Sequence, residues 1–78
     1  MFPGFSELAQ RRRDLAAELV SLRQELGLSQ TEVAARMQTS QSAVARLESG
    51  DADVRLSTLE RYAAALGRQL DWKLKGSR

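Results

Sequence analysis

QTEVAARMQTSQSAVARLES, residues 30–49, holds two short apolar-patterned segments separated by MQTSQ, a break too polar for a core and too short for a linker. Just before the first segment, Ser29 and Glu32 have the S-x-x-E spacing of a capping box, which indicates the start of a helix. That helix is expected to bury Val33, Ala34 and Met37. The stretch therefore predicts two helices held close together by a tight turn.

The second of these helices is predicted to be polar along one face. Ser40 is its candidate N-cap and Gly50 ends it. Its inward side is expected to hold Ala43, Val44 and Leu47. The residues expected to face outward are Gln41, Ser42, Ala45, Arg46 and Ser49. Gln and Arg side chains can make paired hydrogen bonds to adenine and guanine in a major groove that admits one helix. The pattern favours a helix-turn-helix with residues 40–49 as recognition helix over its alternative, a helical hairpin with a solvated polar face.

Two further helices are predicted around this pair. The first starts near Ser6, a candidate N-cap, ends at Gly27 and carries an apolar stripe of Leu8, Leu15, Leu19, Leu22 and Leu26. Its first half is less apolar than its second, so we expect that half to project from the domain. The last helix starts at Ser57, precedes Gly67 and places on one face Leu59, Tyr62, Ala63 and Leu66.

Composition excludes several classes of function. The 78 residues make one small domain, and they include no Cys and no His. The commonest metal ligands and the commonest general base are therefore missing, so we expect neither an enzyme nor a metal site or other cofactor. No run approaches the roughly 20 apolar residues of a membrane span, and no export signal stands in the first thirty residues. We expect a cytoplasmic, nucleoid-associated protein without membrane contact.

Residues 15–67 resemble the XRE or Cro-repressor family, and the resemblance is strongest over LGLSQTEVAARMQTSQSAVARLESG, residues 26–50. It implies an all-α fold, a compact four- to five-helix bundle of the lambda-repressor type. It also implies that Gln30 contacts a phosphate and braces Gln41, and that Arg23 pairs with Glu48. The base-reading positions would be Gln41, Ser42 and Arg46. Further phosphate contacts or bracing would come from Ser40, Arg55, Ser57 and Thr58, at helix starts suited to anions.

Two departures from the family pattern bear on these expectations. Gln38 stands where the family usually has Gly, so it must either accept a left-handed backbone or reshape the turn. Asp51 and Asp53 make the next loop acidic where phage repressors tend to be basic. We therefore expect Arg55, beyond the acidic pair, to make the phosphate contact there.

The chain divides into residues 1–13, an N-terminal extension of the first helix, residues 14–67, the helix-turn-helix domain, and residues 68–78, a C-terminal dimerisation tail. Alternation in the tail favours a short strand over a helix. One recognition helix specifies too few base pairs for a single operator, so a two-fold homodimer on an imperfect palindrome of double-stranded DNA is expected. Its anchors would be Leu70, Trp72 and Leu74.

DVRLSTLERYAAALGRQLDWKL, residues 53–74, resembles HigA-type antitoxins and related single-domain regulators. This implies a DNA-binding antitoxin that represses its own operon and neutralises a small cognate toxin protein. Two alternatives stay open. One is a stand-alone or phage-type repressor without a toxin, and the other is a protein-interaction adaptor that has lost DNA binding.

Overall fold

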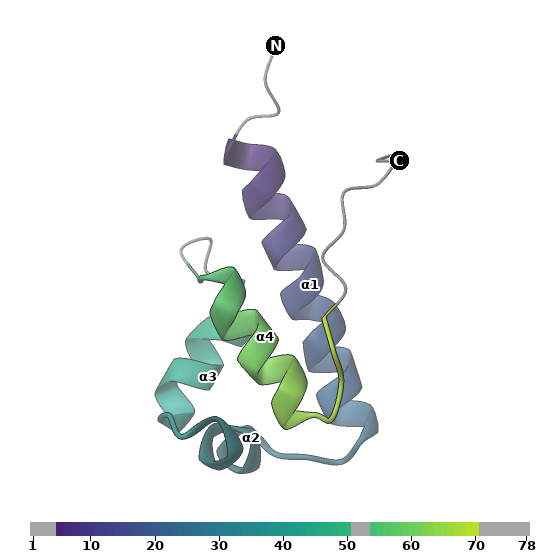
Figure 1. Cartoon of the computed structure of the whole chain (residues 1–78), viewed down its shortest axis with the longest axis vertical. Coiled ribbons are helices and arrows are strands. Elements are labelled where there is room, and N and C mark those ends of the chain that lie inside the picture. The colour runs from purple at the N-terminus through teal and green to yellow at the C-terminus, as the bar shows by residue number, and fades with distance from the viewer. Residues whose placement is uncertain (1–4, 51–53, 71–78) are drawn as a thin grey trace.

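The computed structural model describes residues 5–50 and 54–70, with side chains from residue 7 onward. It contains four helices: α1 (Phe5–Glu25), α2 (Gln30–Met37), α3 (Gln41–Glu48) and α4 (Leu56–Ala65) (Figure 1). Those two ranges hold no strand, which confirms the all-α bundle. The predicted tail strand falls mostly outside them, and residues 68–70 are neither helix nor strand.

The C-terminal half of helix α1 packs beside α4, and its N-terminal end extends beyond the other helices (Figure 1). Leu19 is buried in the core, whereas Leu8 and Leu26 are 41% and 45% exposed, so the predicted stripe is not buried along its whole length. The prediction that Ser6 caps the helix is wrong, because the helix already includes Phe5. Glu7 in the first turn supplies a negative charge that stabilises a helix start without a serine cap.

The caps predicted for the two central helices are confirmed. The Ser29 hydroxyl accepts from the Glu32 amide at 3.0 Å, and the Glu32 carboxylate accepts from the Ser29 amide at 2.8 Å, which completes the capping box. The Ser40 hydroxyl accepts from the Ala43 amide at 3.1 Å. These bonds fix where α2 and α3 begin, and therefore where the turn between the two helices ends.

Gln38 accepts a left-handed backbone, the first of the two conformations predicted for it. Its backbone is left-handed, with φ 58° and ψ 47°, whereas the ends of the other three helices use glycines with positive φ. The Gln38 amide donates to the Ala35 carbonyl at 3.1 Å and the Thr39 amide to the Ala34 carbonyl at 2.9 Å. This pair of bonds is the Schellman motif. The turn therefore closes with a left-handed residue that carries a Cβ, which has a conformational cost.

The core forms where the four helices meet. The buried residues are Ala16, Leu19, Val33, Ala34, Met37, Val44, Leu47, Leu59, Tyr62, Ala63 and Leu66. This confirms the inward faces predicted for α2 and α4, although α4 starts at Leu56, one residue earlier than predicted. The prediction for Ala43 is wrong, since it is exposed. Ala43 lies about 100° around the helix from Val44, and the eight residues of α3 bury only Val44 and Leu47.

Helices α2 and α4 close each other's C-terminal ends. Arg36 on α2 donates to the carbonyl of Ala65 at the end of α4, at 2.8 Å. Arg61 on α4 donates in turn to the carbonyl of Met37 at the end of α2. Cations near a helix C-terminus satisfy carbonyls that lack partners within the helix and interact favourably with its dipole. The two arginines therefore fix the relative positions of α2 and α4.

Candidate nucleic-acid interface

The outward face of α3 is polar and accessible. The three predicted base-reading residues, Gln41, Ser42 and Arg46, are all exposed, while Val44 and Leu47 anchor the opposite side of the helix in the core. Ala45, also predicted to face outward, is half-buried. The helix is thus fixed to the domain by one side and presents short and long polar side chains from the other.

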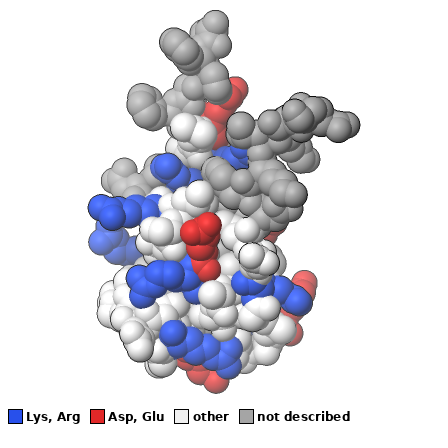
Figure 2. Space-filling view, in the orientation of Figure 1, with Lys and Arg blue, Asp and Glu red and all other residues white. Residues whose placement is uncertain are grey.

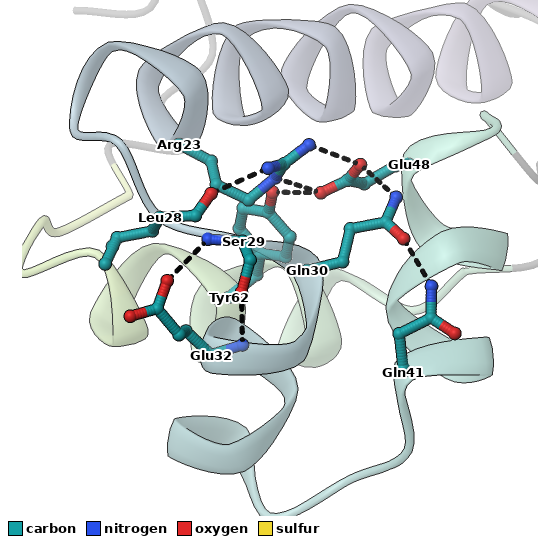
Figure 3. Close-up of polar contacts among 8 residues, drawn as sticks. All are labelled: Arg23, Leu28, Ser29, Gln30, Glu32, Gln41, Glu48 and Tyr62. Atoms are coloured by element: carbon teal, nitrogen blue, oxygen red, sulfur yellow. Dashed lines mark hydrogen bonds and ion pairs between the residues drawn. The ribbon is translucent and has the colours of Figure 1, made fainter.

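Gln41 is held by a neighbour from the preceding helix. Its Nε2 donates to the Oε1 of Gln30 at 2.6 Å, and the Nε2 of Gln30 donates to the Oε1 of Glu48 at 2.8 Å (Figure 3). The predicted bracing partners are therefore in contact. The first residue of α3 is connected, through the first residue of α2, to the last residue of α3.

Glu48 and Arg23 form the predicted ion pair. The Arg23 Nε and Nη2 atoms lie 2.7 Å from Oε2 and 3.1 Å from Oε1 of Glu48, and Nη1 donates to the Leu28 carbonyl at 2.7 Å. The two side chains are only 12% and 8% exposed. Two-point contacts of this kind hold both orientation and distance. The pair therefore joins α1 to the end of α3.

Tyr62 completes the cluster and was missed as a polar partner. The sequence pattern placed it on the core face of α4, where it is fully buried, but its hydroxyl donates to Oε2 of Glu48 at 2.5 Å (Figure 3). Helical periodicity predicts on which face of a helix a residue lies, but it does not predict which partner the terminal hydroxyl contacts. A usable signal existed, because a buried tyrosine hydroxyl normally needs a partner, and Glu48 was the carboxylate predicted to pair internally.

The cluster keeps Glu48 ionised. Burial opposes the charged form, but hydrogen bonds from Arg23, Tyr62 and Gln30 outweigh it and lower the Glu48 pKa below its ordinary 4.5. Stability supplied by this carboxylate is therefore present above pH 4.5 and is lost as pH falls through the lowered native pKa. The Arg23 pKa is raised, chiefly by its hydrogen bond to Glu48. Burial, together with the bond to Glu48, raises the Tyr62 pKa.

The residues predicted to meet phosphate lie at two helix starts. Ser40 caps α3, and Arg55 is the exposed N-cap residue of α4, with no side-chain hydrogen bond to the helix. Ser57 is exposed in the first turn of α4. Thr58 is half-buried, and its amide already donates to the Arg55 carbonyl at 3.0 Å. The acidic residues Asp51 and Asp53 lie outside the described residues.

Two of the three predicted dimer anchors lie outside the described residues. Trp72 and Leu74 are not among the described residues. Leu70 is half-buried against the core of its own domain, in a groove that it lines with Leu15, Leu19 and Leu22 of α1. Leu70 therefore has an intramolecular contact that the sequence pattern did not predict.

The described surface carries charges of both signs. Basic side chains recur across the face shown in Figure 2, with acidic ones among them, and they do not merge into one stripe.

Within the described ranges, no group of three or more acidic side chains could hold a metal ion. None of the described helices is both long and apolar enough to cross a membrane.

Comparison with known proteins places the chain in a family. It is 45% identical over 69 residues to Antitoxin HigA1 of Mycobacterium tuberculosis, in strain CDC 1551 / Oshkosh and equally in strain ATCC 25618 / H37Rv. The match covers 88% of this chain and 46% of each relative, so the chain spans about half the length of these proteins. A search of solved structures gave no significant match. The helix-turn-helix family matches residues 12–73, most of the chain, and the protein therefore belongs to the helix-turn-helix family.

Proposed function

We propose that this protein is a sequence-specific DNA-binding transcriptional regulator that inserts α3 into the major groove of double-stranded DNA. One observation carries the proposal: the exposed side of α3 bears Gln41, Ser42 and Arg46, and Gln41 is held by Gln30. Side chains held in one position lose little entropy on binding, which favours selective contact with base edges. Family membership supports a regulator over an enzyme.

Phosphate contacts are proposed on either side of α3. Gln30 and Ser40 lie at the starts of α2 and α3, and Arg55 and Ser57 lie at the start of α4. The first amides of a helix have no partners within it and attract anions. Phosphate contacts of this kind would fix how deeply α3 enters the groove and carry no sequence information themselves.

We infer further that the protein is an antitoxin that represses its own operon. The support is the name of its relatives, Antitoxin HigA1, over a segment that covers 88% of this chain. Its binding partners would be an operator near its own promoter, a second copy of the chain and a small toxin. We propose that the two copies pair through Leu70, Trp72 and Leu74 and bind an imperfect palindrome.

The DNA proposal is tested by selection from a library of duplexes with a randomised centre. Arg46→Ala and Gln41→Ala should each remove about 1–3 kcal/mol of discrimination at one base pair and leave the other base pairs as they are. Gln24→Ala and Arg68→Ala, exposed residues of the same types away from α3, serve as matched controls. Unchanged base preference in both α3 variants would contradict the assignment of α3 as recognition helix.

The antitoxin proposal is tested with the reading frame next to the gene. Expression of its product should stop growth, and co-expression of this protein should restore growth through a complex that copurifies. Operator binding without such a neighbour would favour a repressor that has no toxin. A toxin complex without any DNA binding would favour the adaptor. Sedimentation of the full chain and of a Trp72→Ala variant tests the dimer.

A further inference from the structure

We propose that Glu48 is a positioning residue for base selection: through Gln30 it fixes which way the Gln41 amide faces, and so makes Gln41 select adenine. The inference rests on the proposed DNA-binding function. It goes beyond that function because Glu48 lies at the far end of α3 from Gln41 and is only 8% exposed, so it has no direct route to a base.

The first step concerns the direction of the hydrogen bonds. Gln41 donates to Gln30, and Gln30 donates to Glu48 (Figure 3). An amide side chain has a donor end and an acceptor end of nearly the same shape, so two glutamines in contact can satisfy each other in either direction. Nothing in the contact between Gln30 and Gln41 alone chooses between them.

The second step is that Glu48 removes this ambiguity. An ionised carboxylate only accepts hydrogen bonds, so Gln30 must turn its Nε2 toward Glu48 and its Oε1 toward Gln41. Gln41 must then meet that oxygen with its own Nε2, because its Oε1 would bring two acceptors together. The charge on Glu48 is thereby translated into one orientation of the outermost amide.

The third step is that Glu48 itself is rigidly held. Its Oε2 accepts from the Arg23 Nε at 2.7 Å and from the Tyr62 hydroxyl at 2.5 Å, while Oε1 accepts from the Arg23 Nη2 at 3.1 Å. These donors come from α1 and α4, so the carboxylate is anchored to the core of the domain and not only to its own helix.

The consequence lies at the exposed edge of Gln41. One N–H of its Nε2 is used by Gln30, which leaves its Oε1 and the second N–H for a base. An adjacent acceptor and donor are complementary to the N6 amino group and the N7 atom of adenine. The base preference of an exposed glutamine is thus determined by a partly buried glutamate on the same helix.

Glu48→Gln is the decisive variant, because it keeps the size of the side chain and changes its hydrogen-bonding pattern. The oxygen of the new amide should take the position where Arg23 Nε and Tyr62 both donate. Its Nε2 then lies against Gln30, and the hydrogen bond from Arg23 Nη2 is lost. Gln30 and Gln41 should then both turn around. Selection from randomised duplexes should show the adenine preference of wild type, roughly tenfold or more, lost at that one base pair.

Tyr62→Phe is the matched control. It disturbs the same cluster and removes one donor to Glu48, yet it leaves the carboxylate and therefore the direction of the bonds. Its base preference should equal that of wild type. Gln30→Met, which interrupts the connection but keeps Glu48, should lose the adenine preference as Glu48→Gln does, and the double variant should lose no more.

The outcomes separate this inference from the proposed function. If Gln41→Ala abolishes the preference while folded Glu48→Gln or Gln30→Met retains it, the positioning role is wrong and the recognition helix stands. Equal losses in Glu48→Gln and Tyr62→Phe would also overturn it, since general loosening of the cluster would explain both. If Gln41→Ala changes nothing, the proposed function fails at this residue and the inference fails with it.

A readout without DNA completes the test. In the free protein, NMR temperature coefficients should show one hydrogen-bonded and one solvated proton on the Gln41 side-chain amide, in wild type and in Tyr62→Phe. In Glu48→Gln both protons should behave as solvated, because the amide oxygen would face Gln30. The same pattern in all three proteins would overturn the proposal whatever the chain binds.

Discussion

The two ends of α1 use the same residue type in different ways. At the inner end, Arg23 is 12% exposed and donates to Glu48, 25 residues away, and to the Leu28 carbonyl. Nearer the outer end, Arg13 donates to Gln10 at 2.8 Å, three residues away on the same helix, and its side-chain carbons lie beside Gly50. The hydrogen bonds of Arg23 thus join α1 to other parts of the chain, whereas that of Arg13 stays within α1. Substitutions at the two ends should therefore have very different effects.

Loss of Glu48 should have the largest effect. Glu48→Ala leaves the partly buried Arg23 guanidinium without its acceptor, and we expect the free energy of unfolding to fall by about 3–5 kcal/mol. Glu60→Ala, an exposed charge deletion on α4, should stay within about 0.5 kcal/mol. Denaturant unfolding of Glu48→Ala, Arg23→Ala and the double variant measures the coupling. Additive losses below about 1 kcal/mol would show that the pair behaves like an exposed one.

Alanine substitutions of two leucines of α1 should also differ strongly in their effect on stability. Leu19→Ala removes a side chain that is 6% exposed and should cost about 2–5 kcal/mol through lost burial and the cavity left behind. Leu8→Ala, at a position that is 41% exposed, should change stability by less than about 0.5 kcal/mol. Thermal melts of both compare the two ends directly. Similar losses would mean that the outer half of α1 is covered as well as the inner half.

The Tyr62 hydroxyl should have a moderate effect and a distinct dependence on pH. Tyr62→Phe removes a hydrogen bond to a charged group and should cost about 1.5–3 kcal/mol. Because the native pKa of Tyr62 is raised, its contribution is complete below the ordinary value of 10.0 and declines as pH rises above it. Tyr62 is the only tyrosine, so phenolate absorbance reports it alone. Ionisation near pH 10 in the folded protein would contradict its burial against Glu48.

The smallest effect is expected at the outer end itself. Glu7→Gln removes the acidic residue of the first turn of α1 and should cost about 0.3–1 kcal/mol at low salt, with less at high salt. Chemical denaturation at two ionic strengths would detect this. A loss that does not change with salt would indicate a specific partner for Glu7 in place of the helix dipole.

The sequence was most informative where local chemistry and a repeated spacing agreed. Caps at Ser29 and Ser40 are short-range features, and they were placed correctly. The contacts among Gln30, Gln41, Arg23 and Glu48 join distant residues, and only the family resemblance indicated them, since no periodicity pairs residues 25 apart.

The errors have a common physical origin. Ala43 was assigned to the inward face of α3 from its helical spacing, but burial depends on whether another helix lies over that part of the surface. The Tyr62 hydroxyl and the two arginine contacts to helix ends depend on how α4 is rotated and where it stops. Those quantities are set by packing of the whole bundle, so helical periodicity alone does not give them.

The exchange of arginines between α2 and α4 also has a consequence for local unfolding. Backbone hydrogen bonds close the last turn of each helix, but one terminal carbonyl of each receives its donor from an arginine of the other helix. The last turns of both should thus open together in native-state hydrogen exchange, as one cooperative unit, while the outer turns of α1 open separately and at lower free energy.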